Sequence, residues 1–198
     1  MTNRKQIAIL GGSFDPITVG HVKLAQFVLD SKISDEVWIT PCFQHIYGKK
    51  MADAQDRIKM CELAVADNPK LKVFTYEIDN RLEGSTYGFV KRLLQEPFAE
   101  NHNFSIVIGM DNANTFNKWV NYKLLAKMVR FVVLARKGVE RNPKNSWYLK
   151  LPHMFLNQNS TPEVSSTQVR SLIKENNSAK EFLNPDVLKY IIDKKLYR

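Results

Sequence analysis

Residues 7–21 read IAILGGSFDPITVGH, and this stretch indicates how the chain folds. Its first four residues are apolar and predict a buried strand that ends at the glycine pair, and residues 22–29 predict the helix that follows. The alternation continues, with strands expected at 36–40, 72–76, 104–108 and 131–135 and helices at 54–65 and 87–94. Such alternation is typical of an α/β protein with a doubly wound parallel sheet and helices on both of its faces.

Ligands bind beyond the carboxyl ends of the strands in such sheets, so we expect functional residues in the loops after residues 10, 40, 76, 108 and 135. Residues 136–152 are basic and rich in Pro, Asn and Lys, which predicts a surface loop. A C-terminal helical segment should follow, with one helix from Ser165 or Ser166 and another from Asn184-Pro185. Because the sequence has no internal repeat and no linker, we expect a single domain over residues 1–198.

The composition narrows the class of partner. Lys and Arg number 29 and Asp and Glu 20, and the net charge of +9 favours a polyanion: nucleic acid, an anionic membrane or a phosphorylated small molecule. Cys42 and Cys61 are too few for a disulfide framework and lack a metal-ligand spacing, so we expect a reducing cytoplasmic location and no protein-held metal. The first apolar run is too short for a signal peptide or a membrane span.

The loop after the first strand has the features of a phosphate site. Gly11 and Gly12 are expected to adopt positive φ and to let the backbone approach a ligand, and the next helix directs free N–H groups to the region of Gly20 and His21. Thr18 lies three residues before His21, so a hydroxyl and an imidazole could face one phosphate. The spacing is neither G-x-G-x-x-G nor a Walker A loop. The plainer alternative is a tight turn with a histidine that caps or packs a helix.

A second anion site is indicated by residues 164–170, VSSTQVR, which precede an apolar helical run. Free N–H groups at a helix start, three hydroxyls and the guanidinium of Arg170 one turn later could together bind phosphate oxygens. The plainer alternative is an ordinary N-cap with a surface arginine.

The two motifs together resemble those of the adenylyltransferase branch of the nucleotidyltransferase α/β-phosphodiesterase superfamily, which has a Rossmann-like fold. Its signatures are (H/T)-x-G-H, here residues 18–21, and I-S-S-T-x-x-R, here residues 164–170. Many members have a histidine where this chain has Thr18. Threonine cannot take a proton, but its hydroxyl can hydrogen-bond a phosphate oxygen.

Further segments resemble the nicotinamide/nicotinate mononucleotide adenylyltransferases. They are residues 108–119, residues 45–60, residues 134–138 and, more loosely, residues 84–87. The resemblance implies that Thr18, His21, Ser166 and Arg170 are catalytic. It implies ATP binding by Gly12, Ser13, Phe14, Gly20, Gly109, Asp111, Arg136, Ser165 and Thr167, and mononucleotide binding by Lys49 or Lys50, Thr86 and Trp119.

The implied reaction is adenylyl transfer from ATP to nicotinate or nicotinamide mononucleotide, which yields deamido-NAD or NAD and pyrophosphate in NAD biosynthesis. A phosphate with a second pKa of about 6 is already nucleophilic at neutral pH, so no covalent protein nucleophile is required. Mg²⁺ is expected with ATP, to offset repulsion between two phosphorylated substrates.

Two alternatives follow from the same sequence. Phosphopantetheine adenylyltransferase also carries threonine in the first motif, but it is typically shorter and lacks the segment with Asp111 and Trp119 in this form. A basic nucleic-acid-binding module without catalysis would explain the charge of +9, yet no helix-turn-helix, zinc-finger or RNP motif is present. We therefore expect neither nucleic acid nor membrane as a partner. The sequence leaves open the choice between nicotinate and nicotinamide and whether the chain forms a homo-oligomer.

Overall fold

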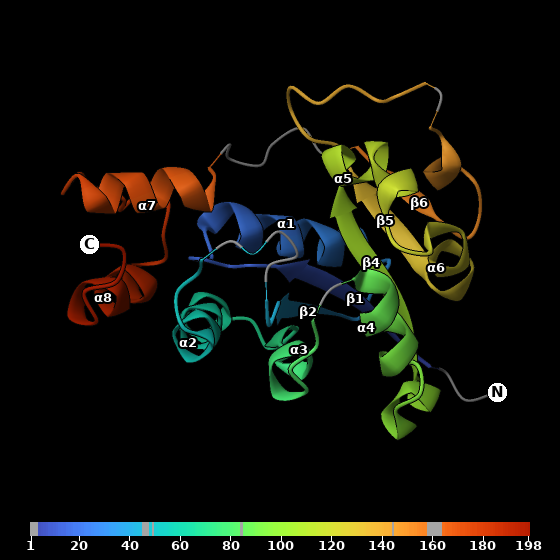
Figure 1. Cartoon of the computed structure of the whole chain (residues 1–198), viewed down its shortest axis with the longest axis horizontal. Coiled ribbons are helices and arrows are strands. Elements are labelled where there is room, and N and C mark those ends of the chain that lie inside the picture. Colours follow the sequence, from blue (N-terminus) through green and yellow to red (C-terminus); the bar gives the residue numbers. More distant parts are fainter. Residues whose placement is uncertain (1–3, 45–47, 49, 84, 144, 158–163) are drawn as a thin grey trace.

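The computed structural model describes residues 4–44, 48, 50–83, 85–143, 145–157 and 164–198. These residues form a six-stranded, entirely parallel sheet with the strand order β3-β2-β1-β4-β5-β6 (Figure 1). The strands are β1 (Lys5–Gly12), β2 (Glu36–Pro41), β3 (Leu71–Val73), β4 (His102–Gly109), β5 (Arg130–Leu134) and β6 (Met154–Leu156). The expected α/β, Rossmann-like doubly wound sheet is thus confirmed.

Helices connect and flank the strands. In the described part of the chain they are α1 (Val19–Asp30), α2 (Ala54–Val65), α3 (Tyr76–Asp79), α4 (Thr86–Leu93), α5 (Met110–Asn114), α6 (Tyr122–Met128), α7 (Ser166–Lys174) and α8 (Pro185–Asp193). Short 3₁₀ helices cover Pro97–Asn101, Phe116–Lys118 and Trp147–Leu149. Within the described residues, none of the helices combines the length and the apolar character needed to cross a bilayer.

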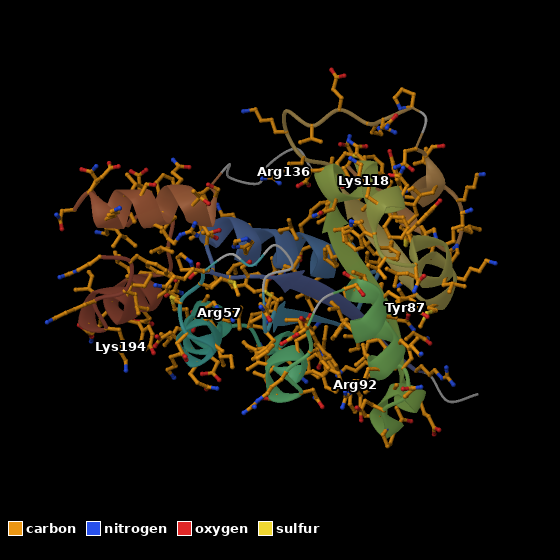
Figure 2. The ribbon with its side chains drawn as sticks, viewed as in Figure 1. Arg57, Tyr87, Arg92, Lys118, Arg136 and Lys194 are labelled. Carbon is orange, nitrogen blue, oxygen red and sulfur yellow. The ribbon has the colours of Figure 1, made fainter. Side chains whose placement is uncertain are left out.

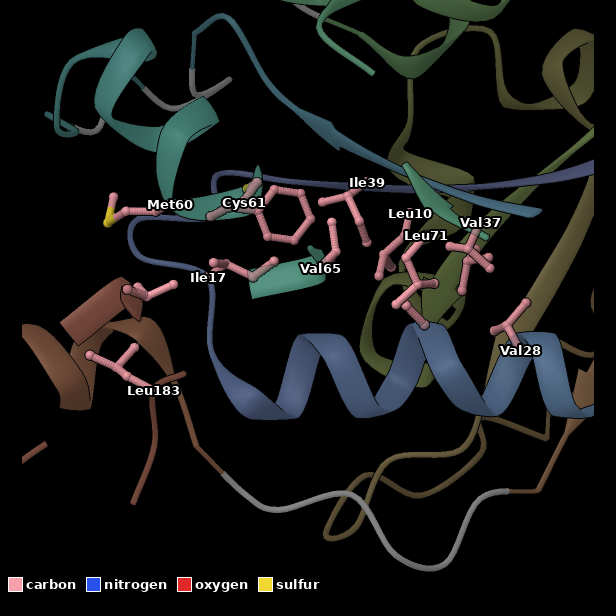
Figure 3. Close-up of a cluster of buried hydrophobic side chains, with 14 of the residues drawn as sticks. Leu10, Ile17, Val28, Val37, Ile39, Met60, Cys61, Val65, Leu71 and Leu183 are labelled. Carbon is pink, nitrogen blue, oxygen red and sulfur yellow. The ribbon is translucent and has the colours of Figure 1, made fainter. Parts of the chain in front are cut away.

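Apolar side chains on both faces hold the sheet between two layers of helices. Along β1, Ala8 and Leu10 face one cluster, whereas Ile7 and Ile9 face the other, as expected where successive side chains point to opposite faces. The first cluster joins the strands to α1, α2, α7 and α8, and Figure 3 shows part of it, including Val28 of α1 and Cys61 of α2. The second joins them to α3, α4, α5 and α6. Two-sided burial explains why the strands are apolar runs rather than alternating ones.

The strand order creates one topological switch point. Strands β2 and β3 lie in sequence on one side of β1, and strands β4, β5 and β6 lie in sequence on its other side. The connections leave opposite faces there, and in doubly wound sheets ligands bind at such a point, beyond the carboxyl ends of the strands, here β1 and β4. The loop after Gly12 and the loop after Gly109 follow these two strand ends.

The C-terminal helices lie at the end of the molecule toward which β1 runs, at the left of Figure 1. Val169 of α7 and Val187 and Ile191 of α8 are almost fully buried in the first cluster. The N–H of Val19, the first residue of α1, donates to the carbonyl of Phe182 at 2.9 Å. These contacts tie the C-terminal segment to the loop after β1.

Most elements lie within two residues of the sequence expectations, and three differences are larger. The strand expected at 72–76 ends at Val73, and Tyr76 starts α3, because its ring packs between Phe74 and Phe89 and its hydroxyl binds Glu96. The helix expected from residue 22 begins at Val19. Strand β6 was not expected, because it is three residues long and only partly buried. The helix expected at 54–65 has those bounds.

Candidate functional site

The loop after β1 is shaped by an aromatic residue. Phe14 has a φ of 47°, a left-handed conformation that bulky residues rarely adopt, and its ring is 2% exposed. A Cβ on Gly12 would lie 3.1 Å from that ring, so Gly12 is the residue that admits it. The expectation of positive φ at Gly11 and Gly12 is wrong: the turn is made at Phe14, which bends the chain over its own ring.

His21 is held in one orientation by Thr18. The Thr18 N–H donates to Nδ1 of His21 at 3.0 Å, and the Thr18 hydroxyl lies 3.0 Å from the same nitrogen. The ring also meets the edge of Phe14 at a centroid distance of 5.2 Å. Because Nδ1 accepts from a backbone donor, the imidazole proton is on Nε2, which has no acceptor among the described residues.

The electrostatic environment keeps this imidazole uncharged. Burial, and secondarily the positive charge of Arg136, lower the pKa of His21 to about 4. Thr18 is 2% exposed, and its described hydroxyl contact is with the ring. The expected contacts of Thr18 and His21 with phosphate stay predictions.

The second motif lies directly against the first. Ser165 caps α7, since its side chain accepts from the N–H of Gln168 at 3.1 Å. The hydroxyl of Ser166 donates to the carbonyl of Pro16 at 2.8 Å, across 150 residues of sequence. Arg170 donates from Nη1 to the carbonyl of Asp15 at 2.7 Å and from Nη2 to the hydroxyl of Thr167 at 3.1 Å. The N-terminus of α7 therefore joins the loop that leads to His21.

The carboxylate of Asp15 is the buried centre of this junction. Its Oδ1 accepts from the N–H of Ala52 at 3.1 Å and from the hydroxyl of Tyr197 at 2.8 Å. Its Oδ2 lies 3.7 Å from Nη1 of Arg170, in a side chain that is 2% exposed. The carboxylate thus connects the loop after β1, α7, the segment before α2 and the chain end.

Arg57 is a functional candidate to which the sequence assigned no role. It lies on α2, is 1% exposed, and donates to the carbonyls of Ser13 at 2.9 Å, Ala52 at 3.1 Å and Phe43 at 3.4 Å (Figure 2). A buried charge costs free energy unless it is hydrogen-bonded, and these carbonyls satisfy it. A charged residue within the apolar stripe of α2 was the available signal.

Residues that follow β4 and β5 supply a second group of charges beyond the carboxyl ends of the strands. Asp111 and Arg136 form an ion pair, with Oδ2 and Nη1 at 3.0 Å. A Cβ on Gly109 would lie 2.5 Å from Oδ1 of Asp111, so glycine is required for this carboxylate to fold back. Oδ1 itself is buried and has no hydrogen-bond partner among the described residues. A pocket of about 370 Å³ opens beside them, and its lining includes Arg136, Lys137 and Arg141.

The expected mononucleotide residues are less well defined. Lys49 lies outside the described residues, and Lys50 is exposed in the loop after β2. Thr86 is the first residue of α4, after the N-cap Ser85. Trp119 is partly buried against Phe116, at a centroid distance of 5.4 Å, which gives its ring a packing role. Contact of these side chains with a ligand stays a prediction.

The site residues offer hydrogen-bond donors rather than metal ligands. Across the described ranges, no three side chains of His, Cys, Asp or Glu gather in a way that could hold a metal ion. What the residues share is donor groups: Nε2–H of His21, the guanidinium groups of Arg170 and Arg136, and the N-termini of α1 and α7. Such an arrangement stabilises anions, phosphates above all.

Comparisons with known proteins agree with this chemistry. Residues 9–172 match the Cytidylyltransferase-like family. A curated protein of Lactococcus lactis subsp. lactis (strain IL1403) is 31% identical over 99% of this chain and 97% of its own length, and one of Anaeromyxobacter sp. (strain K) is 29% identical over all of both; each is named "Probable nicotinate-nucleotide adenylyltransferase".

A solved structure has the same fold. It is the Plasmodium falciparum nicotinic acid mononucleotide adenylyltransferase complexed with NaAD, with a TM-score of 0.82 and 23% identity over 98% of this chain and 97% of that one.

Proposed function

The chain belongs to the Cytidylyltransferase-like family and, within it, to the nicotinate-nucleotide adenylyltransferases, and from this membership we propose its reaction. It is a nucleotidyltransferase that transfers the adenylyl group of ATP to a pyridine mononucleotide, in NAD biosynthesis. The names of its relatives favour nicotinate mononucleotide as the acceptor. The products would be deamido-NAD and pyrophosphate.

One observation carries the proposal: the two motifs expected to bind the triphosphate meet. Ser166 and Arg170 of α7 bond to the carbonyls of Pro16 and Asp15, two and three residues before Thr18. The N-terminus of α7 thus lies against the loop after β1, and we expect both to face ligands at the switch point, where ligands of doubly wound sheets bind.

Catalysis would come from positioning and charge stabilisation. The 5′-phosphate of the mononucleotide attacks the α-phosphorus of ATP, the bond from that phosphorus to the β-phosphate oxygen breaks, and pyrophosphate leaves. His21 would donate from Nε2 as a neutral hydrogen-bond donor, and Arg170 would supply permanent charge to the leaving group. Gly12, Ser13 and Phe14 would bring backbone close to the nucleotide, with Gly20, Ser165 and Thr167 at the two helix starts.

The substrates would lie on either side of the switch point. Asp111 and Arg136, joined to each other in the structure, would hold the ATP side together with Gly109. Lys49 or Lys50, Thr86 and Trp119 would hold the mononucleotide. Arg57 adds a buried positive charge behind the loop after β2, which favours a phosphate there.

Mg²⁺ fits this site as an ion carried by ATP. The described residues include no cluster of carboxylates that could hold Mg²⁺. Mg²⁺ prefers phosphate oxygens and water as ligands, so it does not require such a cluster. When bound, it would neutralise triphosphate charge and polarise a phosphoryl oxygen. Arg170 and Arg136 are the residues that would share that charge.

Other attributes belong to the same proposal. The free thiols of Cys42 and Cys61 support a reducing cytoplasmic location. We take residues 1–198 as one nucleotidyltransferase domain that needs neither nucleic acid nor membrane, either as a monomer or as a homo-oligomer.

A pyrophosphate assay tests the reaction. The protein is incubated with ATP and Mg²⁺ and, in turn, nicotinate mononucleotide, nicotinamide mononucleotide or 4′-phosphopantetheine. We expect pyrophosphate and a dinucleotide with nicotinate mononucleotide, and less with the amide. Turnover only with 4′-phosphopantetheine would favour the alternative enzyme. No turnover, with binding to RNA or DNA that salt weakens steeply, would favour a nucleic-acid-binding module.

Two substitutions test the assigned catalytic groups. His21→Ala and Arg170→Ala should each lower kcat on the order of 100- to 1000-fold, as loss of a well-placed donor to a transition state does. Thermal melting checks that both variants remain folded. Near-normal turnover of either variant would contradict its assigned role.

A further inference from the structure

The penultimate residue of the chain reaches the loop after β1. Helix α8 ends at Asp193, and Lys195 and Tyr197 then adopt φ values of 55° and 65°, which bend the chain back. The Tyr197 hydroxyl donates to Oδ1 of Asp15 at 2.8 Å, across 182 residues of sequence. Left-handed backbone at a bulky side chain costs free energy, so the surrounding contacts must hold Tyr197 there.

The hydroxyl of Tyr197 is a donor under all ordinary conditions. Burial, and after it the charge of Asp15, raise the pKa of Tyr197 far above its usual value. The phenol therefore keeps its proton and presents it to the carboxylate. Met60 of α2 lies beside it, with sulfur and hydroxyl oxygen 4.0 Å apart.

Asp15 stands beside Arg170 without engaging it fully. The distance of 3.7 Å between Oδ2 and Nη1 exceeds that of a charge-assisted hydrogen bond, about 2.7–2.9 Å. The other carboxylate oxygen, Oδ1, accepts from the N–H of Ala52 and the hydroxyl of Tyr197. Among the described residues, only two N–H groups of Arg170 donate to an acceptor, and the side chain is 21% exposed. The guanidinium thus keeps donors for a ligand.

We propose that Tyr197 is a positioning residue that, by holding the carboxylate of Asp15 back, leaves the guanidinium of Arg170 available to the triphosphate. The inference rests on the proposed function, in which Arg170 binds ATP. Without the hydroxyl, Oδ1 loses one of its two donors, and the carboxylate becomes free to close on Arg170. A close ion pair would then compete with phosphate for the same N–H groups.

A matched pair of substitutions tests this role. Tyr197→Phe removes the hydroxyl, and Tyr190→Phe removes a hydroxyl that binds Asp56 of α2 at 2.7 Å, also from the C-terminal segment but outside the Asp15 network. Steady-state kinetics should show the KM for ATP raised about tenfold in Tyr197→Phe, the lower end of what a hydrogen bond to a charged group contributes. The KM for the mononucleotide should change less than twofold, and Tyr190→Phe should leave both constants unchanged.

A second background tests whether the effect passes through Asp15. In Asp15→Asn the neutral amide cannot form the competing ion pair, so adding Tyr197→Phe should raise the KM for ATP less than twofold further. If Tyr197 had only a structural role, Tyr197→Phe would raise the KM for ATP by the same factor in the wild type and in Asp15→Asn. An unchanged KM in Tyr197→Phe, or an equal rise in Tyr190→Phe, would also overturn the proposal.

A probe that keeps the hydroxyl gives a reading even if Tyr197→Phe does not fold. With 3-fluorotyrosine at position 197 alone, the ¹⁹F resonance should move when ATP saturates the protein, whereas the same probe at position 190 should not respond. An unmoved signal at 197 would refute the coupling. This experiment reports ATP binding in the absence of a mononucleotide. A wild-type protein that makes no dinucleotide would therefore contradict the proposed function but not this inference.

Discussion

At the scale of single residues, His21 illustrates how the backbone sets the chemistry of a side chain. Its Nδ1 accepts from the N–H of Thr18, so the ring presents a proton from Nε2 and carries no charge. A neutral donor has a consequence for catalysis, because it can stabilise a phosphate without being titrated at physiological pH. The sequence motif alone did not specify which nitrogen of this ring carries the proton.

An NMR titration checks the state of this ring. The ¹⁵N signals of His21 should show the proton on Nε2 at neutral pH and a midpoint at about pH 4, because burial and Arg136 lower its pKa. Between about pH 6.5 and 4 the unfolded chain binds a proton that the folded chain does not, so His21 makes stability fall as pH falls through this window. The spectrum of His21→Asn assigns the signal. A midpoint near 6.5 would contradict the buried, backbone-bonded ring.

Gly109 offers a second test at the same scale. In Gly109→Ala the new Cβ would lie 2.5 Å from Oδ1 of Asp111, so the carboxylate must shift, and we expect its ion pair with Arg136 to be disturbed. We expect kcat/KM for ATP to fall on the order of 10- to 100-fold, as misplacement of binding groups does.

Gly88→Ala is the control for Gly109→Ala. The added Cβ on Gly88 would lie at an ordinary 3.7 Å from Ser85 within α4, so turnover should be kept. If Gly109→Ala also kept full activity, the Asp111–Arg136 pair would not be part of the ATP site.

At the scale of elements, two adjacent serines at the N-terminus of α7 make contacts of different kinds. Ser165 bonds within its own helix, whereas Ser166 bonds to Pro16 in the loop after β1. The first contact keeps the helix intact, and the second joins the helix to the loop. Two adjacent hydroxyls of the same type therefore do different things.

Alanine substitutions distinguish the two serines. Ser165→Ala should lower the stability by about 1 kcal/mol, the usual cost of an N-cap, and the melting temperature by roughly 2–4 °C. Ser166→Ala should lower kcat at least tenfold, beyond its effect on melting, because the loop that carries His21 loses its attachment to α7. Calorimetry and pyrophosphate release measure the two quantities. Equal ratios of activity loss to stability loss in the two variants would mean that Ser166 only stabilises the fold.

At the scale of the whole molecule, local sequence patterns predicted the fold where burial is two-sided. The apolar runs of β1, β2, β4 and β5 and the helix at 54–65 are specified by their own residues. Strand β6 is not, because three partly buried residues carry little pattern and pair with β5 only through the sheet. The fold class could thus be predicted more completely than the sheet edge.

The site was predictable in part for a similar reason. The resemblance marked the loop after β1 and the start of α7 as one site, and these two segments do meet. The left-handed Phe14, the carbonyl partners of Arg57 and the contact of Tyr197 with Asp15 could not be predicted. Each depends on groups brought together by the completed fold, across as many as 182 residues.

The free energy of unfolding of the whole chain should depend on pH through Glu77, a carboxyl on α3 close to Arg57. Burial raises the pKa of Glu77 to about 7, although the N–H of Phe43 and the charge of Arg57 act against it. Between about pH 4.5 and 7 the folded chain keeps a proton that the unfolded chain has released. Ionisation of Glu77 therefore makes stability fall as pH rises through that window.

Glu77→Gln should remove this loss, because a glutamine is neutral at every pH and its carbonyl can still accept from Phe43. Chemical unfolding from pH 4 to 8 should show the variant gaining on the wild type by about 1–3 kcal/mol as pH rises, since each pKa unit corresponds to about 1.4 kcal/mol. Glu62→Gln, at an exposed carboxylate of α2 that pairs with Lys59, controls for the substitution itself. A difference between Glu77→Gln and the wild type that stays constant with pH would show that Glu77 is ionised in the folded chain, with the guanidinium of Arg57 outweighing its burial.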